Sequence, residues 1–413
     1  MDNVVLKNVC PFVDGKLELA KTVAIVDDVW QKSAPEGTPE LDGNGALLLP
    51  GLFALGMDFQ EPARDDVYTY RAGFRAMRRG GFCGGLYESS ANPVDGIERL
   101  VAERAALEKG GLDIRILGAI SQGFASKSLA EMRELADGGV AGFGDGNRSF
   151  GTMRFLRLSL EYGAMTGKRF FFLPYDYSLA HGGFVNEGNF SDMMGMKGVP
   201  EQAETIPLFA LLEMSRWLQV PLHIKQVTSR AALDLIRRYR EKRLDVTCDV
   251  DAHHLLFCDE DLASLDTGLN LHPPLRSAED GAALWEGLAD GTVDAVSFNH
   301  FPVHREDKEV NFEAAVPGAV SLEIALPMLW DKLSGKLGVK RAMELLSENP
   351  ARISGAEPPA LHPGARVSAV LFDPSGKTLV EPKTFVGGVQ NSPFLHKELP
   401  GKVLGTYFAE IRG

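Results

Sequence analysis

The sequence predicts an α/β fold: a closed (β/α)8 barrel of the TIM type with a small β-sandwich domain built from both termini. Two observations support this fold. Strand-like and helix-like segments alternate through the middle of the chain, whereas both ends consist of short alternating runs broken by Gly and Pro. The alternative, a doubly wound open sheet, is disfavoured because no Gly-rich phosphate turn follows the first strand. The predicted boundaries are 51–357 for the barrel and 1–50 plus 358–413 for the β-domain.

The predicted barrel strands are short apolar runs rich in β-formers. In chain order they are Leu47–Phe59, Phe82–Tyr87, Asp113–Ile120, Gly139–Phe143, Arg169–Leu173, Val220–Val227, Asp245–Val250 and Thr292–Phe298. Helical spacing of apolar residues predicts helices at Val67–Arg79, Asp95–Lys109, Leu129–Ala136, Thr152–Gly163, Gln202–Leu218, Ser229–Arg243 and Ser277–Ala289. The flanks offer hairpin strands at Val4–Val9, Thr22–Val26, Arg366–Phe372 and Lys402–Glu410.

Composition and charge limit the function classes. The chain has 413 residues, 45% of them hydrophobic and 24% charged, with a formal net charge of −13. This charge argues against broad binding of nucleic acid or of anionic membranes. No apolar run approaches the roughly 20 residues that span a bilayer, and the N-terminus does not resemble a signal peptide. The four cysteines form no CxxC pair, so we expect reduced thiols in a cytoplasmic protein.

Several stretches match one enzyme family in order and spacing. They are Pro50–Pro62, Asp145–Asn147, Tyr177–Gly188, Gly198–Thr205, His253–Leu256, Pro273–Arg276, Asp294–His304, Asn349–Ile353 and Asn391–Leu395. Any one of them is weak, but the ordered set covers most of the chain. Together they resemble dihydroorotases of the long bacterial type, in the amidohydrolase superfamily. The resemblance implies a (β/α)8 barrel with a composite β-domain, in agreement with the pattern above.

The resemblance also implies where the catalytic groups should stand. In active relatives a zinc-bound hydroxide attacks the ring amide, and an Asp moves a proton to the leaving nitrogen. The metal-ligand positions fall on Gly56, Asp58, Leu173 and Gln226, and on or near Asp145. The catalytic Asp falls on Asn299. Histidines one residue apart would share a strand face, yet none of the nine histidines is so placed. We therefore expect no catalytic residues, no metal and no cofactor.

The substrate contacts implied by the resemblance are altered as well. The arginine that clamps the substrate carboxylate falls on Gln60, and two asparagines fall on Ser90 and His272. Loss of the guanidinium removes a bidentate, charge-assisted contact. Among the residues near the site, only His300 is unchanged.

These losses favour a dihydroorotase homologue without hydrolytic activity. The resemblance is closest to the non-catalytic subunit that some bacteria pair with aspartate transcarbamoylase. Such a subunit would form a homodimer within a larger hetero-oligomer. Two alternatives remain at this point: an enzyme with a rebuilt metal site using Asp58, Asp145, His223 or His300, and a small-molecule sensor that uses the old pocket.

Overall fold

Eight parallel strands form the barrel wall in the computed structural model, which describes residues 3–408. In hydrogen-bonded order they are β7 (Leu52–Met57), β8 (Phe82–Tyr87), β9 (Asp113–Gly118), β10 (Gly142–Phe143), β11 (Arg169–Phe172), β14 (Leu222–Ile224), β15 (Val246–Asp251) and β16 (Ala295–Ser297). Strand β16 returns to the side of β7, which brings the barrel close to closure. The predicted (β/α)8 fold is confirmed.

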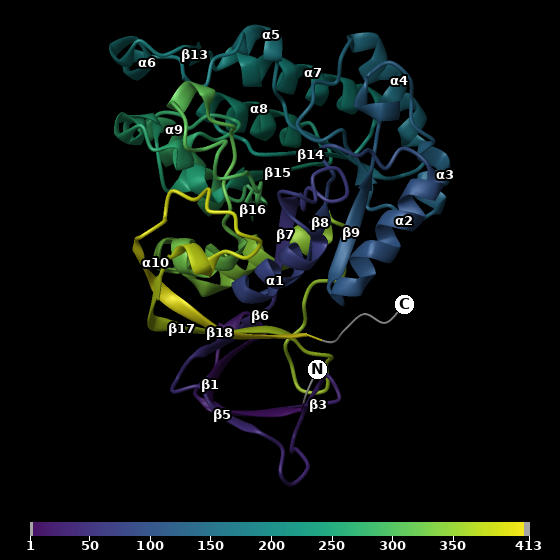
Figure 1. Ribbon diagram of the computed structural model, residues 1–413. Helices are drawn as coiled ribbons and strands as arrows, with labels where there is room; N and C mark the ends of the chain where they lie inside the picture. The colour runs from purple at the N-terminus through teal and green to yellow at the C-terminus, as the bar shows by residue number, and fades with distance from the viewer. Residues whose placement is uncertain (1–2, 409–413) are drawn as a thin grey trace.

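Helices cover the outside of the barrel (Figure 1). The α-helices of the described residues are α1 (Tyr70–Gly80), α2 (Ile97–Leu107), α3 (Met132–Asp137), α4 (Met153–Ala164), α5 (Tyr177–Ala180), α6 (Asn189–Met194), α7 (Gln202–Leu218), α8 (Arg230–Glu241), α9 (Ala278–Asp290), α10 (Ala325–Met343) and α11 (Asn349–Ile353). Helix α6 packs beside β12 (Val185–Asn186), away from the barrel wall. Helices α1, α4, α8 and α9 begin where a Ser or Thr side chain accepts a backbone N–H of the first turn, the preferred N-cap arrangement. Within residues 3–408, none of the helices has the length and apolarity to cross a membrane.

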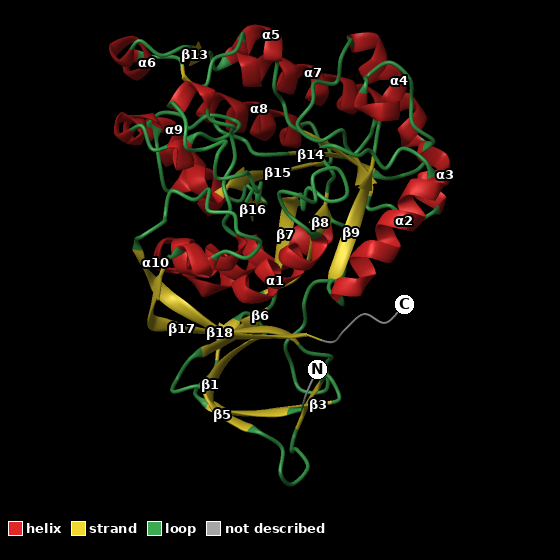
Figure 2. Cartoon of the chain, viewed as in Figure 1, coloured by secondary structure: helices red, strands yellow, loops and turns green. Residues whose placement is uncertain are grey.

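The remaining large sheet is a β-domain assembled from both ends of the chain. Its strands are β1 (Val4–Val13), β2 (Lys16–Leu17), β3 (Lys21–Val26), β4 (Val29–Gln31), β5 (Glu40–Asp42), β6 (Leu47–Pro50), β17 (Ser368–Leu379) and β18 (Glu398–Phe408). Figure 2 shows β6, β17 and β18 facing β3 and β5, with the curved β1 joining the two halves. Leu6, Val23, Trp30, Leu48 and Leu371 belong to the apolar core between them. The short strands β12 (Val185–Asn186) and β13 (Gly198–Val199) pair separately.

One predicted strand, Leu47–Phe59, is wrong as a single element. It contains β6, which pairs with β1 and β17, and β7, which belongs to the barrel. Gly51 stands at the break and donates its N–H to the Ser368 carbonyl oxygen. Apolar periodicity indicates which residues are buried but not which sheet provides their hydrogen-bond partners. A prediction from periodicity therefore merges two consecutive strands that belong to different sheets. The predicted strand Lys402–Glu410 extends past residue 408 and so lies partly outside the described residues.

Aromatic side chains fill part of the space between the barrel wall and its helices. The Phe170 ring is fully buried and lies 5.6 Å from that of Phe143 and 6.0 Å from that of Phe172. Gly163 in α4 approaches Phe170 so closely that an added Cβ would lie 2.1 Å from the ring. Packing of this density fixes the helix against the strand and leaves little freedom to substitute either residue.

Candidate functional site at the barrel mouth

A cavity of about 390 Å³ opens where the barrel strands end at their carboxyl side. It is lined by Gly56, Asp58, Glu88, Ser90, Gly146, Asn147, Arg148, Tyr177, Gln226, Asn299, His300 and Phe301. In (β/α)8 enzymes this face carries the active site. The cavity therefore brings together many of the positions named from sequence. It does not bring in Gln60, Asp145, Leu173 or His272, which are absent from its lining.

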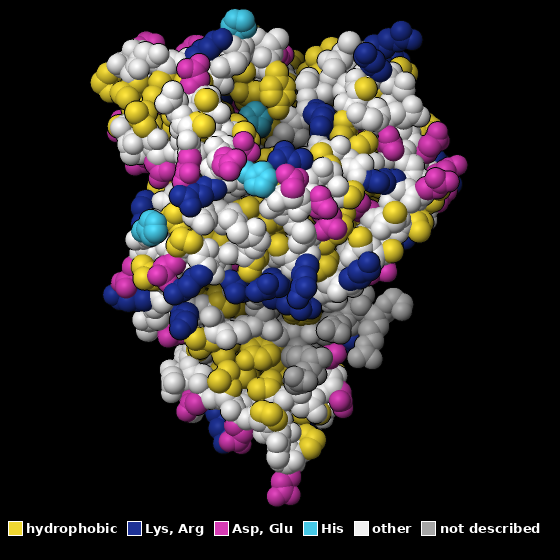
Figure 3. Space-filling view, in the orientation of Figure 1, with side chains coloured by type: hydrophobic (Ala, Val, Ile, Leu, Met, Phe, Trp, Pro, Cys, Tyr) yellow, Lys and Arg dark blue, Asp and Glu magenta, His cyan; other side chains and the backbone are white. Residues whose placement is uncertain are grey.

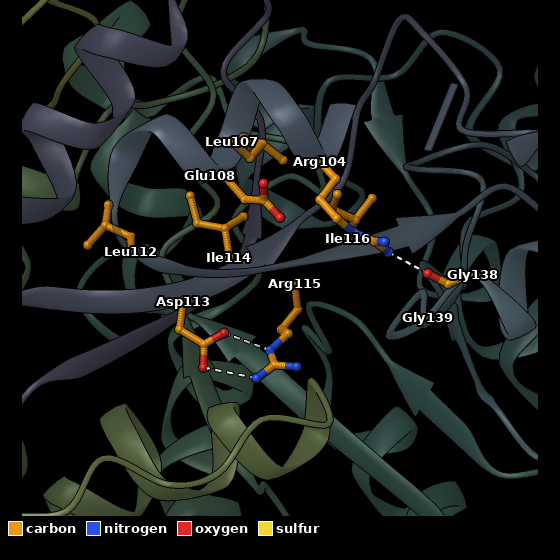
Figure 4. A pocket seen from close by; sticks show the side chains of 10 residues that line it. All are labelled: Arg104, Leu107, Glu108, Leu112, Asp113, Ile114, Arg115, Ile116, Gly138 and Gly139. Atoms are coloured by element: carbon orange, nitrogen blue, oxygen red, sulfur yellow. Dashed lines mark hydrogen bonds and ion pairs between the residues drawn. The ribbon is translucent and has the colours of Figure 1, made fainter. Parts of the chain in front are cut away.

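A second cavity, of about 350 Å³, lies at the amino-terminal side of β9 (Figure 4). Arg115 pairs there with Asp113, and Arg104 donates to the Gly138 carbonyl oxygen. Leu107, Ile114 and other apolar side chains supply much of the remaining wall. Because conserved chemistry in this architecture resides at the opposite face, the mouth is the candidate site.

The two carboxylates that stand at the family's metal-ligand positions, Asp58 and Asp145, accept hydrogen bonds from backbone N–H groups. Asp58 accepts the N–H of Gln60 (2.7 Å) on one oxygen and the N–H of Ser90 (2.8 Å) on the other. Asp145 accepts the N–H groups of Ile120 and Ser121, and the Ser121 hydroxyl at 2.6 Å. Burial raises the pKa of both carboxyl groups, although these hydrogen bonds act in the opposite direction.

The backbone at the mouth departs from strand geometry. Gly56, Gln60, Gln226 and Asn299 have φ of 64°, 63°, 51° and 36°, in the left-handed region. The β7–β8 pairing also shifts register between Ala54 and Met57. The spacing in the sequence predicts that residues 56 and 58 share one face of a regular strand. The structure contradicts that geometry, because the strand bends at Gly56 and ends before Asp58.

A buried ion pair spans the mouth, and the sequence analysis missed it. Lys225 Nζ lies 2.5 Å from Glu88 Oε2 and 2.9 Å from the Gly146 carbonyl oxygen. Glu88 Oε1 accepts the Gly146 N–H at 3.1 Å. The three residues follow β14, β8 and β10, so the pair ties together three strand ends. A lysine directly after the buried strand β14 is the signal that identifies this group, since lysine is rarely buried without a partner.

The remaining predicted residues have structural partners. Leu173 packs among apolar neighbours. His223 is buried on β14, with Nε2 2.8 Å from Asp249 Oδ2 and Nδ1 2.9 Å from Thr247 Oγ1. The ring of His223 is therefore held by hydrogen bonds inside the barrel. This matches the structural role that a histidine on an apolar strand suggests.

Two neutral histidines flank the cavity. Burial lowers the pKa of His300 to about 3 and that of His272 to about 4, so both rings are uncharged near neutral pH. His272 Nε2 lies 3.0 Å from the Tyr177 hydroxyl, and the His272 carbonyl oxygen accepts the Asn299 amide at 3.2 Å. His300 Nδ1 accepts the N–H of Ser321 at 3.4 Å.

Arg148 lines the cavity from a loop and Tyr177 from the start of α5, and the sequence patterns indicate neither of them. The Arg148 guanidinium donates to the Ser90 carbonyl oxygen at 2.7 Å and lies 4.3 Å from the centre of the Phe124 ring. Tyr177 donates its hydroxyl proton to the Asn147 carbonyl oxygen. Their position at the cavity depends on how the segments that follow β10 and β11 fold against each other. No periodic pattern in the sequence indicates that arrangement.

Comparison with known proteins identifies the family. The chain is 33% identical to a dihydroorotase from Pelotomaculum thermopropionicum, over 94% of this chain and 92% of that protein. The chain belongs to the dihydroorotase family. It is also 32% identical, over 94% of its length and 92% of the relative's, to a protein from Pseudomonas aeruginosa named dihydroorotase-like protein. No protein-family model matches the chain.

Solved structures agree with this family at the level of fold. An L-hydantoinase (dihydropyrimidinase) from Arthrobacter aurescens superposes with a TM-score of 0.85 at 20% identity, covering 100% of this chain and 96% of that one. A D-hydantoinase gives 0.83 at 17% identity, with 99% and 94% covered. The dihydroorotase homologue therefore shares its fold, a barrel with a β-sheet domain, with these hydantoinases.

The mouth of this dihydroorotase homologue does not fit the zinc that the family implies. Among residues 3–408, no three His, Cys, Asp or Glu side chains converge in a way that would hold a metal ion. The oxygens of Asp58 and Asp145 already accept backbone and hydroxyl hydrogens. The Glu88 carboxylate in the same mouth is already paired with the Lys225 ammonium, so it is not a free ligand for a metal ion.

Proposed function

We propose that this chain is a non-hydrolysing dihydroorotase homologue that acts as an assembly subunit for aspartate transcarbamoylase in pyrimidine biosynthesis. In this role it forms a homodimer within a larger hetero-oligomer, and a separate dihydroorotase performs the hydrolysis. The proposal rests above all on the contrast between an intact barrel and a mouth whose groups do not fit a metal.

Three features of the mouth support the absence of hydrolysis. Gly56 and Leu173 offer no donor atom where the family resemblance implies ligands. Asn299, at the position of the catalytic Asp, cannot accept and return a proton near neutral pH. The buried Lys225–Glu88 pair supplies internal charge balance, so the mouth needs no cation to be stable.

The direct test is reconstitution with the aspartate transcarbamoylase of the same organism. The two purified proteins are mixed, and the mass of the eluted species is measured by light scattering after size exclusion. A joint species much heavier than either component, with higher transcarbamoylase activity than the partner alone, supports the proposal. A partner that is fully active and fully assembled without this chain contradicts it.

The cavity favours a second candidate function, the binding of a small metabolite. Gln226 Oε1 and His300 Nε2 are buried atoms of cavity residues, and neither has a hydrogen-bond partner among residues 3–408. His300 accepts through Nδ1, so its Nε2 carries the proton and is a donor. Arg148 adds a guanidinium beside Ser90. An acceptor, a donor and a cation around one cavity suit a small cyclic amide that carries a carboxylate.

Thermal stabilisation tests this second function. Pyrimidine-pathway metabolites with and without a carboxylate are titrated while the melting temperature is recorded, since ligand binding to the native state raises stability. A carboxylate-dependent rise that is lost in Arg148→Gln supports the site. Arg154→Gln, at an exposed position on α4, is the matched control. An unchanged melting temperature across the panel contradicts metabolite binding.

A further inference from the structure

Helix α1 carries a band of arginines on its exposed face. Arg71, Arg75, Arg78 and Arg79 are all exposed, whereas Phe74 and the other apolar residues of the helix are buried. The spacing of four and of seven to eight residues places the guanidinium groups along one side of the helix. In Figure 3 a dark-blue band crosses the molecule where α1 lies in Figure 1. We call these four residues the arginine band.

No ion pair within the described part of the chain involves this band, although Arg79 lies near enough to the buried Glu323 carboxyl to lower its pKa. Arginines elsewhere pair locally, as Arg157 does with Glu161 and Arg305 does with Glu309. None of the four on α1 has such a partner among residues 3–408. The band is therefore a concentrated positive surface on a chain whose net charge is −13.

Helix stability does not account for the whole band. Arg78 and Arg79 lie in the last turn, where a cation interacts favourably with the helix dipole. Arg71 lies in the first turn, where a cation is unfavourable, and that turn contains no acidic residue. A positive charge at the N-terminal end does not stabilise the isolated helix. Its role therefore lies in an interaction outside the helix.

Part of the band is held in place for binding. Arg78 Nη2 donates to the Gly110 carbonyl oxygen at 2.8 Å, and Arg79 Nη1 donates to the Thr384 carbonyl oxygen at 3.0 Å. Carbonyl oxygens orient a guanidinium but leave its full charge uncompensated. Because these side chains are already ordered, less conformational entropy is lost when an anion binds.

The dimensions of the band indicate a protein partner. Helix α1 has 11 residues and is about 16 Å long, the size of one contact patch. A long polyanion would also have to approach a chain whose formal net charge is −13, which would repel it. Arginine is also enriched at the centres of protein interfaces, where it forms bidentate pairs with carboxylates.

We propose that the arginine band docks an acidic segment of a protein partner. The inference rests on the proposed function, in which that partner is the transcarbamoylase chain. Carboxylates of the segment pair with the guanidinium groups of α1.

The test is a charge reversal that spares folding contacts. In Arg71→Glu/Arg75→Glu neither side chain has a hydrogen bond to lose within the part of the chain that the structure describes, and a glutamate at position 71 suits the first helical turn. Arg154→Glu/Arg238→Glu is the matched control, because both of those arginines are exposed and the net charge changes equally. Circular dichroism and melting temperature confirm that each variant is folded. Complex formation with the transcarbamoylase is then measured by light scattering and titration.

We expect binding about tenfold weaker or worse in the band variant, with the control unchanged. Equal binding by wild type and both variants overturns the docking surface and leaves the proposed function standing. No complex with the wild type overturns both. If the band variant assembles normally but loses retention of a short duplex DNA that the wild type binds, the band serves a polyanion and the proposal is wrong.

Discussion

The barrel strands and the residues just beyond their carboxyl ends follow different rules. Along β11, Phe170, Phe171 and Phe172 are apolar, buried and regular in backbone. A few residues past the strand ends, Gln226 and Asn299 adopt left-handed backbone conformations, and Lys225 is buried against Glu88. The comparison indicates that packing of the barrel strands stabilises the fold. Residues at the mouth can therefore differ in chemistry without loss of the fold.

Removing a wall side chain should have the largest effect. Phe170→Ala leaves a cavity between β11 and α4, and we expect a loss of about 3–5 kcal/mol in the free energy of unfolding. Urea denaturation followed by circular dichroism measures it. Phe209→Ala, whose ring on α7 is 51% exposed, is the control and should cost less than about 1 kcal/mol. Similar losses of unfolding free energy in the two variants would contradict the view that the barrel wall stabilises the fold.

At the mouth, breaking the ion pair should matter more than removing it. Lys225→Met leaves the Glu88 carboxylate buried without its cation, and we expect a loss of about 3 kcal/mol. Lys225→Met/Glu88→Gln keeps an acceptor for the Gly146 N–H and removes both charges, so stability should return close to that of the wild type. The same urea titrations apply. A double variant as unstable as the single one would show that the pair itself is needed for the fold.

Glu323 is a buried carboxylate outside the lining of the mouth cavity, and it should make the stability of the fold depend on pH. Burial raises the pKa of Glu323 from 4.5 to about 7, although its Oε1 accepts the Val386 N–H at 3.0 Å. The folded state then binds the proton more tightly than the unfolded chain does. The protonated carboxyl therefore makes its whole contribution to the free energy of unfolding below pH 4.5. That contribution decreases by roughly 2–3 kcal/mol as the pH rises towards 7.

Glu323→Gln should remove this pH dependence while keeping the acceptor for Val386. Unfolding free energies of both proteins at several pH values test it. The advantage of the Gln variant over the wild type should grow as the pH rises. Parallel pH profiles would show that the Glu323 carboxyl titrates alike in the folded and unfolded chains.

Restoring two histidines at the mouth should have the smallest effect of all. In Gly56→His/Asp58→His we expect no dihydroorotate hydrolysis above the buffer blank and no stoichiometric zinc by metal analysis. Residue 56 has φ of 64°, which strains any L side chain, and Leu173 and Gln226 remain poor ligands. Turnover or tightly bound zinc in this variant would mean that the mouth is closer to an active site than proposed.

The fold was predictable because apolar periodicity and the family resemblance agree. The division of Leu47–Phe59 into β6 and β7 was not, since both halves are equally apolar and differ only in their hydrogen-bond partners. Residue positions around the cavity were found through the resemblance. Their conformations were not, because Gln226 belongs to a residue type with no special preference for left-handed backbone.

The charged groups at the mouth come from several different elements and were not predicted from the sequence. Glu88 and Lys225 are separated by more than a hundred residues along the chain, and Arg148 comes from a loop. Spacing along the sequence carries information about one strand or one helix at a time. A pair formed across the barrel becomes visible only when the strand ends are placed together.

The composite β-domain has a consequence for how the chain is made. Strand β6 ends at Pro50, but β17, which pairs with it, begins at Ser368, after the whole barrel. At common rates of synthesis this separation amounts to roughly 15–60 s on the ribosome. During that interval the nascent chain presents β6 with an open hydrogen-bonding edge, the kind of surface that recruits unrelated strands. Arrival of β17 ends that exposure, so sealing of this edge is a late event in biosynthesis.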